Sequence, residues 1–297
     1  MVNKISSFIT KNLVVWVLLC VFIGYVYPLI LVKLKPYNEW FFTFTMFGIG
    51  FVLNFEDFVY VFKKFYIVLL GTLAQFLIMP LGGYLVGQIF SFPLDVKLGF
   101  IITGAVPGAM ASNIISYLAK ADVAYSISLT TFLSPVLTPL FTYIFASSFI
   151  KINFWQMFFS ILRMVVLPVI LGLTIKSLLK EKIKNIINIF PAFSTIFIAF
   201  ICGLVVALNK DFIKQMSFLI LLAAILLNIW GLVLGYLAGY IYKLDEPRRR
   251  TLSIEVGMQN AGLGAVLSLK HFSNQTAIPS AIFATLCVIT ASILAKI

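Results

Sequence analysis

The chain has 297 residues, of which 62% are hydrophobic and 11% are charged, and its mean hydropathy is +1.08. A soluble domain carries roughly 25% charged residues, so this composition excludes a water-soluble protein. The formal charge of +12 is spread over short gaps between apolar runs and forms no basic stripe with aromatic residues, which excludes nucleic-acid binding.

Ten apolar runs of a length suited to crossing a bilayer follow one another along the chain. We expect transmembrane helices at residues 12–32, 40–55, 65–90, 96–119, 122–149, 154–178, 186–208, 216–242, 247–270 and 277–297. The first run is too long for the core of a signal peptide, and no cleavage site follows it, so we expect it to be retained. The sequence therefore predicts an all-α membrane protein with ten transmembrane helices.

The basic residues are divided unevenly between alternate gaps. Of the 22 Lys and Arg residues, 14 fall on the side of the N-terminus, 7 fall on the opposite side, and Arg163 lies within the sixth run. Positive charge accumulates in cytoplasmic loops, and an even number of spans returns the chain to the side where it began. We therefore expect both termini in the cytoplasm.

The runs divide into two sets of five, at residues 1–150 and 151–297. Because five is odd, the second set would be inserted with the opposite topology. Each set has an interrupted, polar fourth run, with Pro107-Gly108 in the first half and Gly257 in the second. Matched interruptions in inverted halves are typical of the binding site of a secondary transporter. We predict two inverted five-helix repeats in which helices 4 and 9 are broken.

Glu255 is the most informative polar residue, because it lies near the middle of the ninth run. A carboxylate in hydrocarbon costs on the order of several kcal/mol unless it is paired, hydrated or bound to a cation. One interpretation is a cation ligand or a proton carrier. The other is a carboxylate that extends toward the arginines at 248–250. The short side chain and its polar neighbours favour the first interpretation.

Other oxygen-bearing side chains complement this carboxylate. Ser126 and Thr130 are four residues apart and share one face of the fifth helix. Together with Asn113 and Glu255 they would form a hard, all-oxygen site with one negative charge, which suits an alkali ion. Arg163, within the sixth run, has two interpretations, as a contact for an anionic substrate or as a snorkelling residue, and we leave it out of the site.

Three motifs resemble those of the bile acid:sodium symporter family, including its bacterial members with ten helices. They are QFLIMP at 75–80, PGAMASN at 107–113 and EVGMQNAGL at 255–263, and their order and spacing run through most of the chain. The resemblance implies a core domain of helices 3–5 and 8–10 and a panel domain of helices 1, 2, 6 and 7. It also implies that helices 4 and 9 cross where they unwind, in a protein of the bacterial inner membrane.

The same resemblance implies two sodium ions that share Glu255. The first sodium site would consist of Ser112, Asn113, Ser126, Thr130 and Glu255. The second would consist of Gln75, Glu255, Gln259 and the backbone carbonyls of Val256 and Met258.

The resemblance also places an organic anion beside the crossover. Its expected contacts are Ala109, Met110, Asn260 and Ala261. Several relatives carry a small hydroxyl residue where this chain has Met110, so a hydrogen bond from that side chain cannot be carried over. The substrate can differ accordingly in size or polarity.

These observations predict a sodium-coupled symporter of organic anions that works by alternating access. Its expected partners are membrane lipid and a small organic anion, either a bile acid or a smaller carboxylate such as pantoate, with no nucleic acid and no obligate protein partner. The second hypothesis is a proton-coupled carrier that uses Glu255 as its proton site. The sequence has no H-E-x-x-H or G-x-S-x-G motif, so we expect that the protein is not an enzyme. A channel or receptor explains the inverted broken helices less well.

Overall fold

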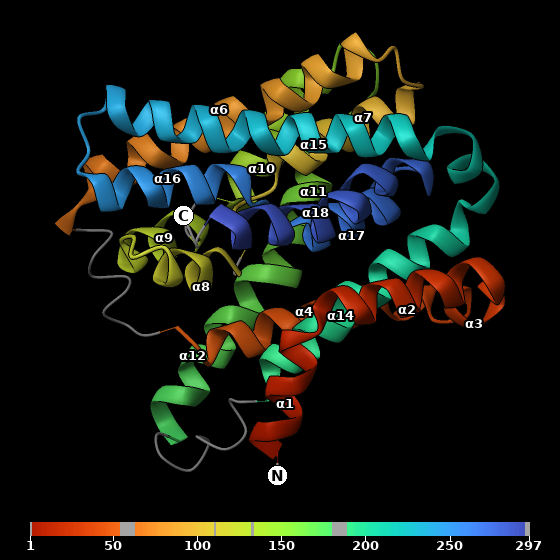
Figure 1. Ribbon diagram of the computed structural model, residues 1–297, viewed down its shortest axis with the longest axis horizontal. Helices are drawn as coiled ribbons and strands as arrows, with labels where there is room; N and C mark the ends of the chain where they lie inside the picture. Colours follow the sequence, from red (N-terminus) through yellow and green to blue (C-terminus); the bar gives the residue numbers. More distant parts are fainter. Residues whose placement is uncertain (1, 54–62, 110, 132–133, 180–188, 295–297) are drawn as a thin grey trace. The chain divides into compact units, whose positions relative to one another are not determined.

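The computed structural model describes residues 2–53, 63–109, 111–131, 134–179 and 189–294. Nearly all of these residues are helical (Figure 1). Within them there is no β-strand, and the only β-type pairing is one isolated antiparallel bridge between Gly108 and Gln259. The all-α class predicted from the sequence is therefore confirmed for the described part of the chain.

The first of two compact units consists of residues 1–54 and 159–215. Its elements are α1 (Val2–Lys11), α2 (Leu13–Val26), α3 (Pro28–Val32), η1 (Lys35–Tyr37), α4 (Asn38–Gly50), η2 (Leu162–Val166), α12 (Leu167–Leu179) and α14 (Phe190–Leu208). Stacked rings of Phe51 and Phe190 join α14 to the end of α4 in its core.

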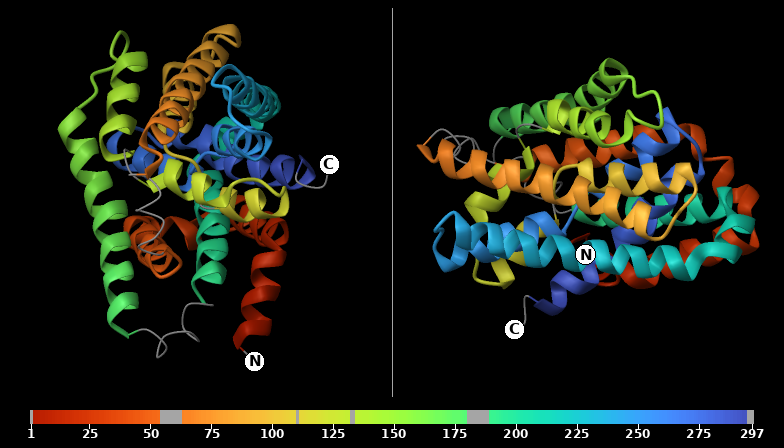
Figure 2. Two further views of the ribbon diagram at one scale, coloured as in Figure 1. Left: turned by 90° about the vertical axis from the view of Figure 1, so that its left-hand side faces the viewer. Right: turned by 90° about the horizontal axis from the view of Figure 1, so that it is seen from above.

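The second unit consists of residues 55–158 and 216–297. Its elements are α6 (Phe65–Ile89), α7 (Leu94–Ala105), α8 (Ala111–Leu118), α9 (Val123–Thr131), α10 (Ser134–Ala146), α11 (Phe154–Ile161), α15 (Lys210–Ile241), α16 (Glu246–Gly257), α17 (Ala261–His271), η4 (Gln275–Ala277) and α18 (Ile278–Leu294). The chain passes between the units within α11 and within α15. Figures 1 and 2 show α6 and α15 side by side, where the Trp230 indole donates a hydrogen bond of 2.9 Å to the Ile78 carbonyl.

Two of the expected spans are interrupted where the sequence predicted it. α7 ends at Ala105 and α8 begins at Ala111, so Pro107-Gly108 lies in the gap. In the same way, α16 ends at Gly257 and α17 begins at Ala261. Proline lacks a backbone donor and glycine lacks a Cβ, so these residues favour the end of a helix at both places.

Two features of the helices were not predicted. The residues before the first run form α1, and the axis of α2 is bent by 73° from it. The helix at Phe154–Leu179 matches its predicted bounds within one residue, but it contains a π-turn at Leu162–Val166. A π-turn inserts one residue into the helical repeat, and hydropathy alone does not indicate such an insertion. Arg163 lies in this turn.

Four described helices are long and apolar enough to cross a membrane. They are Phe65–Ile89, Phe154–Leu179, Phe190–Leu208 and Phe218–Ile241, and the bent pair α1–α2 would make a fifth. The halves of the broken helices are each too short to cross a bilayer alone. Helix length and composition thus identify four or five spans among the described residues, and the architecture of ten spans stays a prediction.

Close packing of α2 and α14 in the first unit depends on two glycines. A Cβ at Gly24 would lie 2.2 Å from the Gly203 carbonyl oxygen, and a Cβ at Gly203 would lie 2.4 Å from the Cys20 carbonyl oxygen. Small residues at such positions allow membrane helices to approach closely.

We predict that Gly203→Leu separates α2 from α14 and lowers the free energy of unfolding by about 1–3 kcal/mol, as overpacking does. The measurement is thermal unfolding of the purified protein in detergent. Ile196→Leu, at an exposed position of the same helix, is the matched control and should leave the melting temperature unchanged. Equal melting temperatures for Gly203→Leu and the wild type would contradict this account of the packing.

Candidate functional site

The interruptions of the two broken helices pair with one another in the second unit. The Ala109 N–H donates to the Met258 carbonyl at 2.7 Å, and the Asn260 N–H donates to the Pro107 carbonyl at 2.7 Å. A helix break leaves amide and carbonyl groups without intrahelical partners, and in a membrane water cannot replace them. Each break therefore supplies partners for the other.

Two asparagines complete the hydrogen bonding at the break between α16 and α17. Asn260 is the N-cap of α17, and its Oδ1 accepts from the Leu263 N–H at 3.1 Å. Asn228 on α15 is fully buried, and its Nδ2 donates to the Gly257 carbonyl at 2.8 Å. The end of α16 and the start of α17 are thus fixed by side chains as well as by the opposite backbone.

The Glu255 side chain lies fully buried in the last turn of α16. Its Oε1 accepts hydrogen bonds from the hydroxyls of Ser112 on α8 and Ser126 on α9, which are also fully buried. The Ser126 Oγ lies 2.8 Å from the Asn113 Oδ1, and the Ser112 Oγ also contacts the Ala109 carbonyl. Two helices, α8 and α9, thus bring their oxygens to a carboxylate on a third, α16.

This cluster has more acceptor oxygens than protons. A serine hydroxyl has one hydrogen, yet both Ser112 and Ser126 face two acceptor oxygens each. A second hydroxyl near Ser126 belongs to Ser116, whose Oγ lies 3.4 Å away. An oxygen-rich, proton-poor cluster with one carboxylate is suited to a hard monovalent cation.

The arginines at 248–250 are engaged elsewhere. Arg248 pairs with Asp122 and Asp245, and Arg250 pairs with Glu246. The Arg249 side chain donates to the Leu244 carbonyl at 2.7 Å. Glu255 makes no ion pair with any lysine or arginine that the structure describes. The geometry therefore favours a cation ligand over a carboxylate extended toward the arginines.

Several buried polar atoms of the residues expected at the second sodium site have no hydrogen-bond partner among the described residues. They are the second Glu255 oxygen, Oε2, both amide atoms of Gln75 and the Gln259 Oε1. Gln75 lies on α6, which packs against α16. An unpaired buried polar atom costs about 1–3 kcal/mol, so a ligand that engages these oxygens would be stabilising. All three residues belong to the set expected for a second sodium ion.

Of the other residues expected at the sodium sites, Val256 and Met258 have carbonyls that already accept hydrogen bonds, and the Thr130 side chain is not described. The Val256 carbonyl accepts from the Gln259 Nε2 at 2.8 Å, and the Met258 carbonyl accepts from Ala109. Each carbonyl oxygen has a second lone pair for a cation. Thr130 lies in α9, but its side chain is outside the described residues.

The residues expected to contact the anion lie at the crossover, with one exception. Ala109, Asn260 and Ala261 are all there, but their backbone N–H groups donate to Met258, Pro107 and Gln259 carbonyls. The Ala109 and Asn260 amides therefore hold the crossover together, and among these three residues the Asn260 side-chain amide remains as a donor for an anion. Met110 lies outside the described residues.

Asn228 is a site residue that the sequence analysis missed. Its Oδ1 is buried without a hydrogen-bond partner among the residues described. The sequence did contain a signal for it, since Asn228 is an amide side chain inside the long apolar eighth run. A polar residue in such a run usually has a functional or structural partner.

A buried carboxylate among hydroxyls, at the paired breaks of two interrupted helices, is typical of one class of protein, the ion-coupled secondary transporters of membranes. A family model described as "Sodium Bile acid symporter family" matches residues 40–216. The chain therefore belongs to the sodium bile acid symporter family. It is a multi-pass membrane protein and a sodium-dependent transporter of a small solute, and not an enzyme.

Individual relatives agree with this assignment. The chain is 35% identical to "Uncharacterized sodium-dependent transporter YocS" of Bacillus subtilis, over 99% of this chain and 92% of that protein. It is 32% identical to "Probable sodium/metabolite cotransporter BASS1, chloroplastic" of Arabidopsis thaliana, over 86% of this chain and 65% of the plant protein. It is 33% identical to "P3 protein" of Homo sapiens, over 67% of this chain and 43% of the human protein.

We predict that sodium raises the melting temperature of the wild-type protein in detergent and that potassium does not, because a ligand that binds only the folded state stabilises it. In Glu255→Gln this sodium-dependent rise should disappear, while the melting temperature without sodium stays equal or increases, because a buried charge is removed.

The matched control is Glu246→Gln, which changes an exposed glutamate at the other end of the same helix and should retain the rise. A full sodium-dependent rise in Glu255→Gln would exclude this carboxylate as a sodium ligand.

Proposed function

We propose that the protein is a sodium-coupled symporter of small organic anions that works by alternating access. The observation that carries the proposal is the buried Glu255 carboxylate, which receives two hydroxyls on one oxygen and has no partner on the other among the described residues. Sodium binding would neutralise this charge and join α8, α9 and α16.

The first sodium ion would be bound by Glu255, Ser112, Asn113, Ser126 and Thr130. The contacts of Ser112 and Ser126 with the carboxylate support this set, as does the Asn113 oxygen beside Ser126. A cation would satisfy the surplus acceptors of this cluster, and its charge would offset the desolvation of the carboxylate.

The second sodium ion would be bound by the remaining Glu255 oxygen, Gln75, Gln259 and the carbonyls of Val256 and Met258. The unpartnered amide oxygens of Gln75 and Gln259 support this assignment. Two ions that share one carboxylate would bind cooperatively if the first orders the second site. Two sodium ions and one monovalent anion would carry one net positive charge, worth about 2.3 kcal/mol per 100 mV.

The organic anion would bind beside the crossover, at Ala109, Met110, Asn260 and Ala261. The half-helices α8 and α17 begin here, and the start of a helix attracts negative charge. Because the backbone amides of Ala109, Asn260 and Ala261 already donate to carbonyls, the Asn260 side chain is the proposed donor. A bile acid and a small carboxylate such as pantoate are the two classes of substrate to compare.

The proposed architecture has ten spans in two inverted repeats, 1–150 and 151–297. The composition of the two compact units supports a core of helices 3–5 and 8–10 and a panel of helices 1, 2, 6 and 7. Relative movement of core and panel would expose the site to each side in turn. The bias of basic residues supports cytoplasmic termini in a bacterial inner membrane.

A proton-coupled carrier is the alternative, with Glu255 as the proton site. Ser112 and Ser126 argue against it, because a proton needs no set of oxygen ligands around the carboxylate. The names of the bacterial and plant relatives specify sodium as well.

We predict sodium-dependent uptake of labelled taurocholate or labelled pantoate by proteoliposomes that contain the wild-type protein. Uptake should be driven by an inward sodium gradient and should stop when potassium replaces sodium, because the anion binds after the carboxylate is neutralised. Glu255→Gln should abolish uptake, and Glu246→Gln should retain it. Uptake that ignores sodium and follows a pH gradient would replace this proposal with the proton-coupled one.

We also predict separate effects at the two sodium sites. Gln259→Ala should increase the sodium concentration for half-maximal uptake and reduce the Hill coefficient for sodium toward one, because it removes a ligand of the second site only. The measurement is a sodium titration of uptake at fixed anion concentration. A half-maximal sodium concentration and a Hill coefficient that are both unchanged in Gln259→Ala would contradict a second sodium site at this residue.

A further inference from the structure

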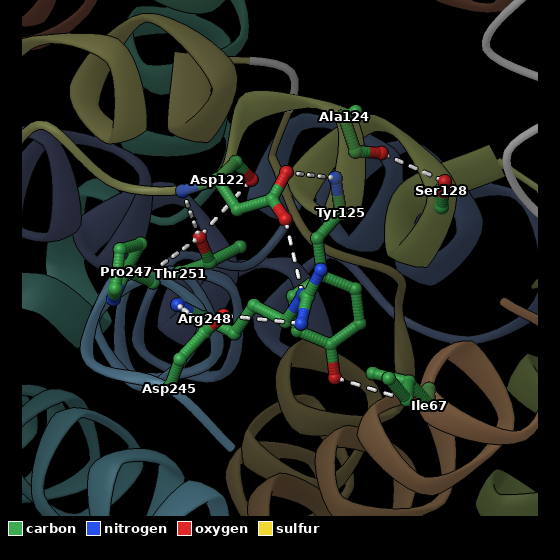
Figure 3. Close-up of polar contacts among 9 residues, drawn as sticks. All are labelled: Ile67, Asp122, Ala124, Tyr125, Ser128, Asp245, Pro247, Arg248 and Thr251. Carbon is green, nitrogen blue, oxygen red and sulfur yellow. Dashed lines mark hydrogen bonds and ion pairs between the residues drawn. The ribbon is translucent and has the colours of Figure 1, made fainter.

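A polar cluster joins the beginning of α9 to the first turns of α16 (Figure 3). The Arg248 Nε donates to the Asp122 Oδ2 at 3.1 Å, and both side chains are about four-fifths buried, with 22% and 19% exposed. The Arg248 guanidinium also pairs with Asp245, the N-cap of α16. The other Asp122 oxygen accepts from the Tyr125 N–H at 3.0 Å and so caps α9.

Thr251 is the centre of this cluster and is fully buried. Its hydroxyl oxygen accepts from the Asp122 N–H at 2.9 Å. The same hydroxyl oxygen lies 3.1 Å from the Asp122 carbonyl and 3.0 Å from the Pro247 carbonyl, either of which can accept its one hydrogen. One side chain on α16 therefore contacts both backbone groups of Asp122, the residue directly before α9. These contacts fix the distance between the two helices, as well as their register.

The register links this cluster to the carboxylate. Asp122 contacts Thr251, and four residues further along each helix Ser126 contacts Glu255. Four residues are about one helical turn, so the two contacts lie one above the other between parallel helices. The contact between Asp122 and Thr251 therefore also fixes the distance between the helices one turn later, where the Ser126 hydroxyl meets the Glu255 carboxylate.

The same layer reaches α6. The Tyr125 hydroxyl donates to the Ile67 carbonyl at 3.2 Å, and a Cβ at Gly71 would lie 2.2 Å from the Tyr125 hydroxyl oxygen. Gly71 is four residues before Gln75 on α6. Tyr125, the residue before Ser126, thus contacts α6 one to two turns before Gln75.

We propose that Asp122, Arg248 and Thr251 are positioning residues that set the sodium affinity of the site without contacting the ion. The inference rests on the proposed function of Glu255 and Ser126 as sodium ligands. Oxygen ligands on separate helices bind a small cation well only when their mutual distance is held, and partners outside the ligand shell supply that constraint. Thr251 holds α16, which carries Glu255, against α9, which carries Ser126.

The test is a sodium titration of the full chain in detergent, read by the sodium-dependent rise in melting temperature and by sodium-dependent uptake in proteoliposomes. Thr251→Val keeps the shape of the side chain and removes the hydroxyl. It should raise the half-saturating sodium concentration on the order of tenfold, as loss of such partners does at metal sites. Thr251→Ser should restore the wild-type value.

Glu246→Gln is the matched control, because it breaks an exposed ion pair on the same helix and should leave the half-saturating concentration unchanged. A purely structural role of Thr251 would lower the melting temperature without sodium and leave the sodium dependence intact, and that result would overturn the proposal. If Thr251→Val does not fold, Asp122→Asn provides the second readout, and an unchanged sodium affinity in that variant overturns the proposal equally.

Ser126→Ala separates this inference from the proposed function. A large loss of sodium affinity in Ser126→Ala with none in Thr251→Val retains the site and rejects the positioning role. No change in either variant rejects the proposed sodium site, and the positioning role with it.

Discussion

Two backbone hydrogen bonds between the interrupted helices are the constraint on which the rest of this structure depends. In a bilayer an unpaired amide or carbonyl costs several kcal/mol, on the order of a lost hydrogen bond in an apolar solvent, so neither helix can be broken there alone. Ala109 pairs with Met258 and Asn260 pairs with Pro107, so each break satisfies the other. The four half-helices then begin or end at one place, and their polar side chains meet there.

The electrostatics of the site follow from this arrangement. Glu255 lies in the last turn of α16, the first half of one broken helix, and Ser112 lies in the first turn of α8, the second half of the other. The crossover therefore brings a buried carboxylate to a hydroxyl from a distant part of the chain, and α9 adds Ser126. Hydroxyls stabilise the charge in part, and a bound cation would supply the remainder. In this account sodium and the crossover are interdependent, which is the basis proposed for coupling sodium to the movement of an anion.

The carboxylate and the two helix breaks could be predicted from the sequence, because polar residues are rare in segments that cross a membrane and those present have a functional or structural role. Glu255 stands out in an apolar run, and Pro107-Gly108 and Gly257 indicate helix breaks by local backbone chemistry. The pairing of Gly108 with Gln259 could not be predicted from the residues alone, because it depends on contacts between distant segments. The same holds for Thr251, which resembles any hydroxyl bonded to the carbonyl one turn before it, and for the π-turn around Arg163.

The most direct test of the central claim is a pair of high-resolution structures of the wild-type protein, one in sodium and one in choline. The account predicts density for an ion in contact with the Glu255 carboxylate and the hydroxyls of Ser112 and Ser126, present in sodium and absent in choline. Identical density in the two salts, with both hydroxyls still donating to the carboxylate and no ion beside it, would contradict the claim that this carboxylate binds sodium.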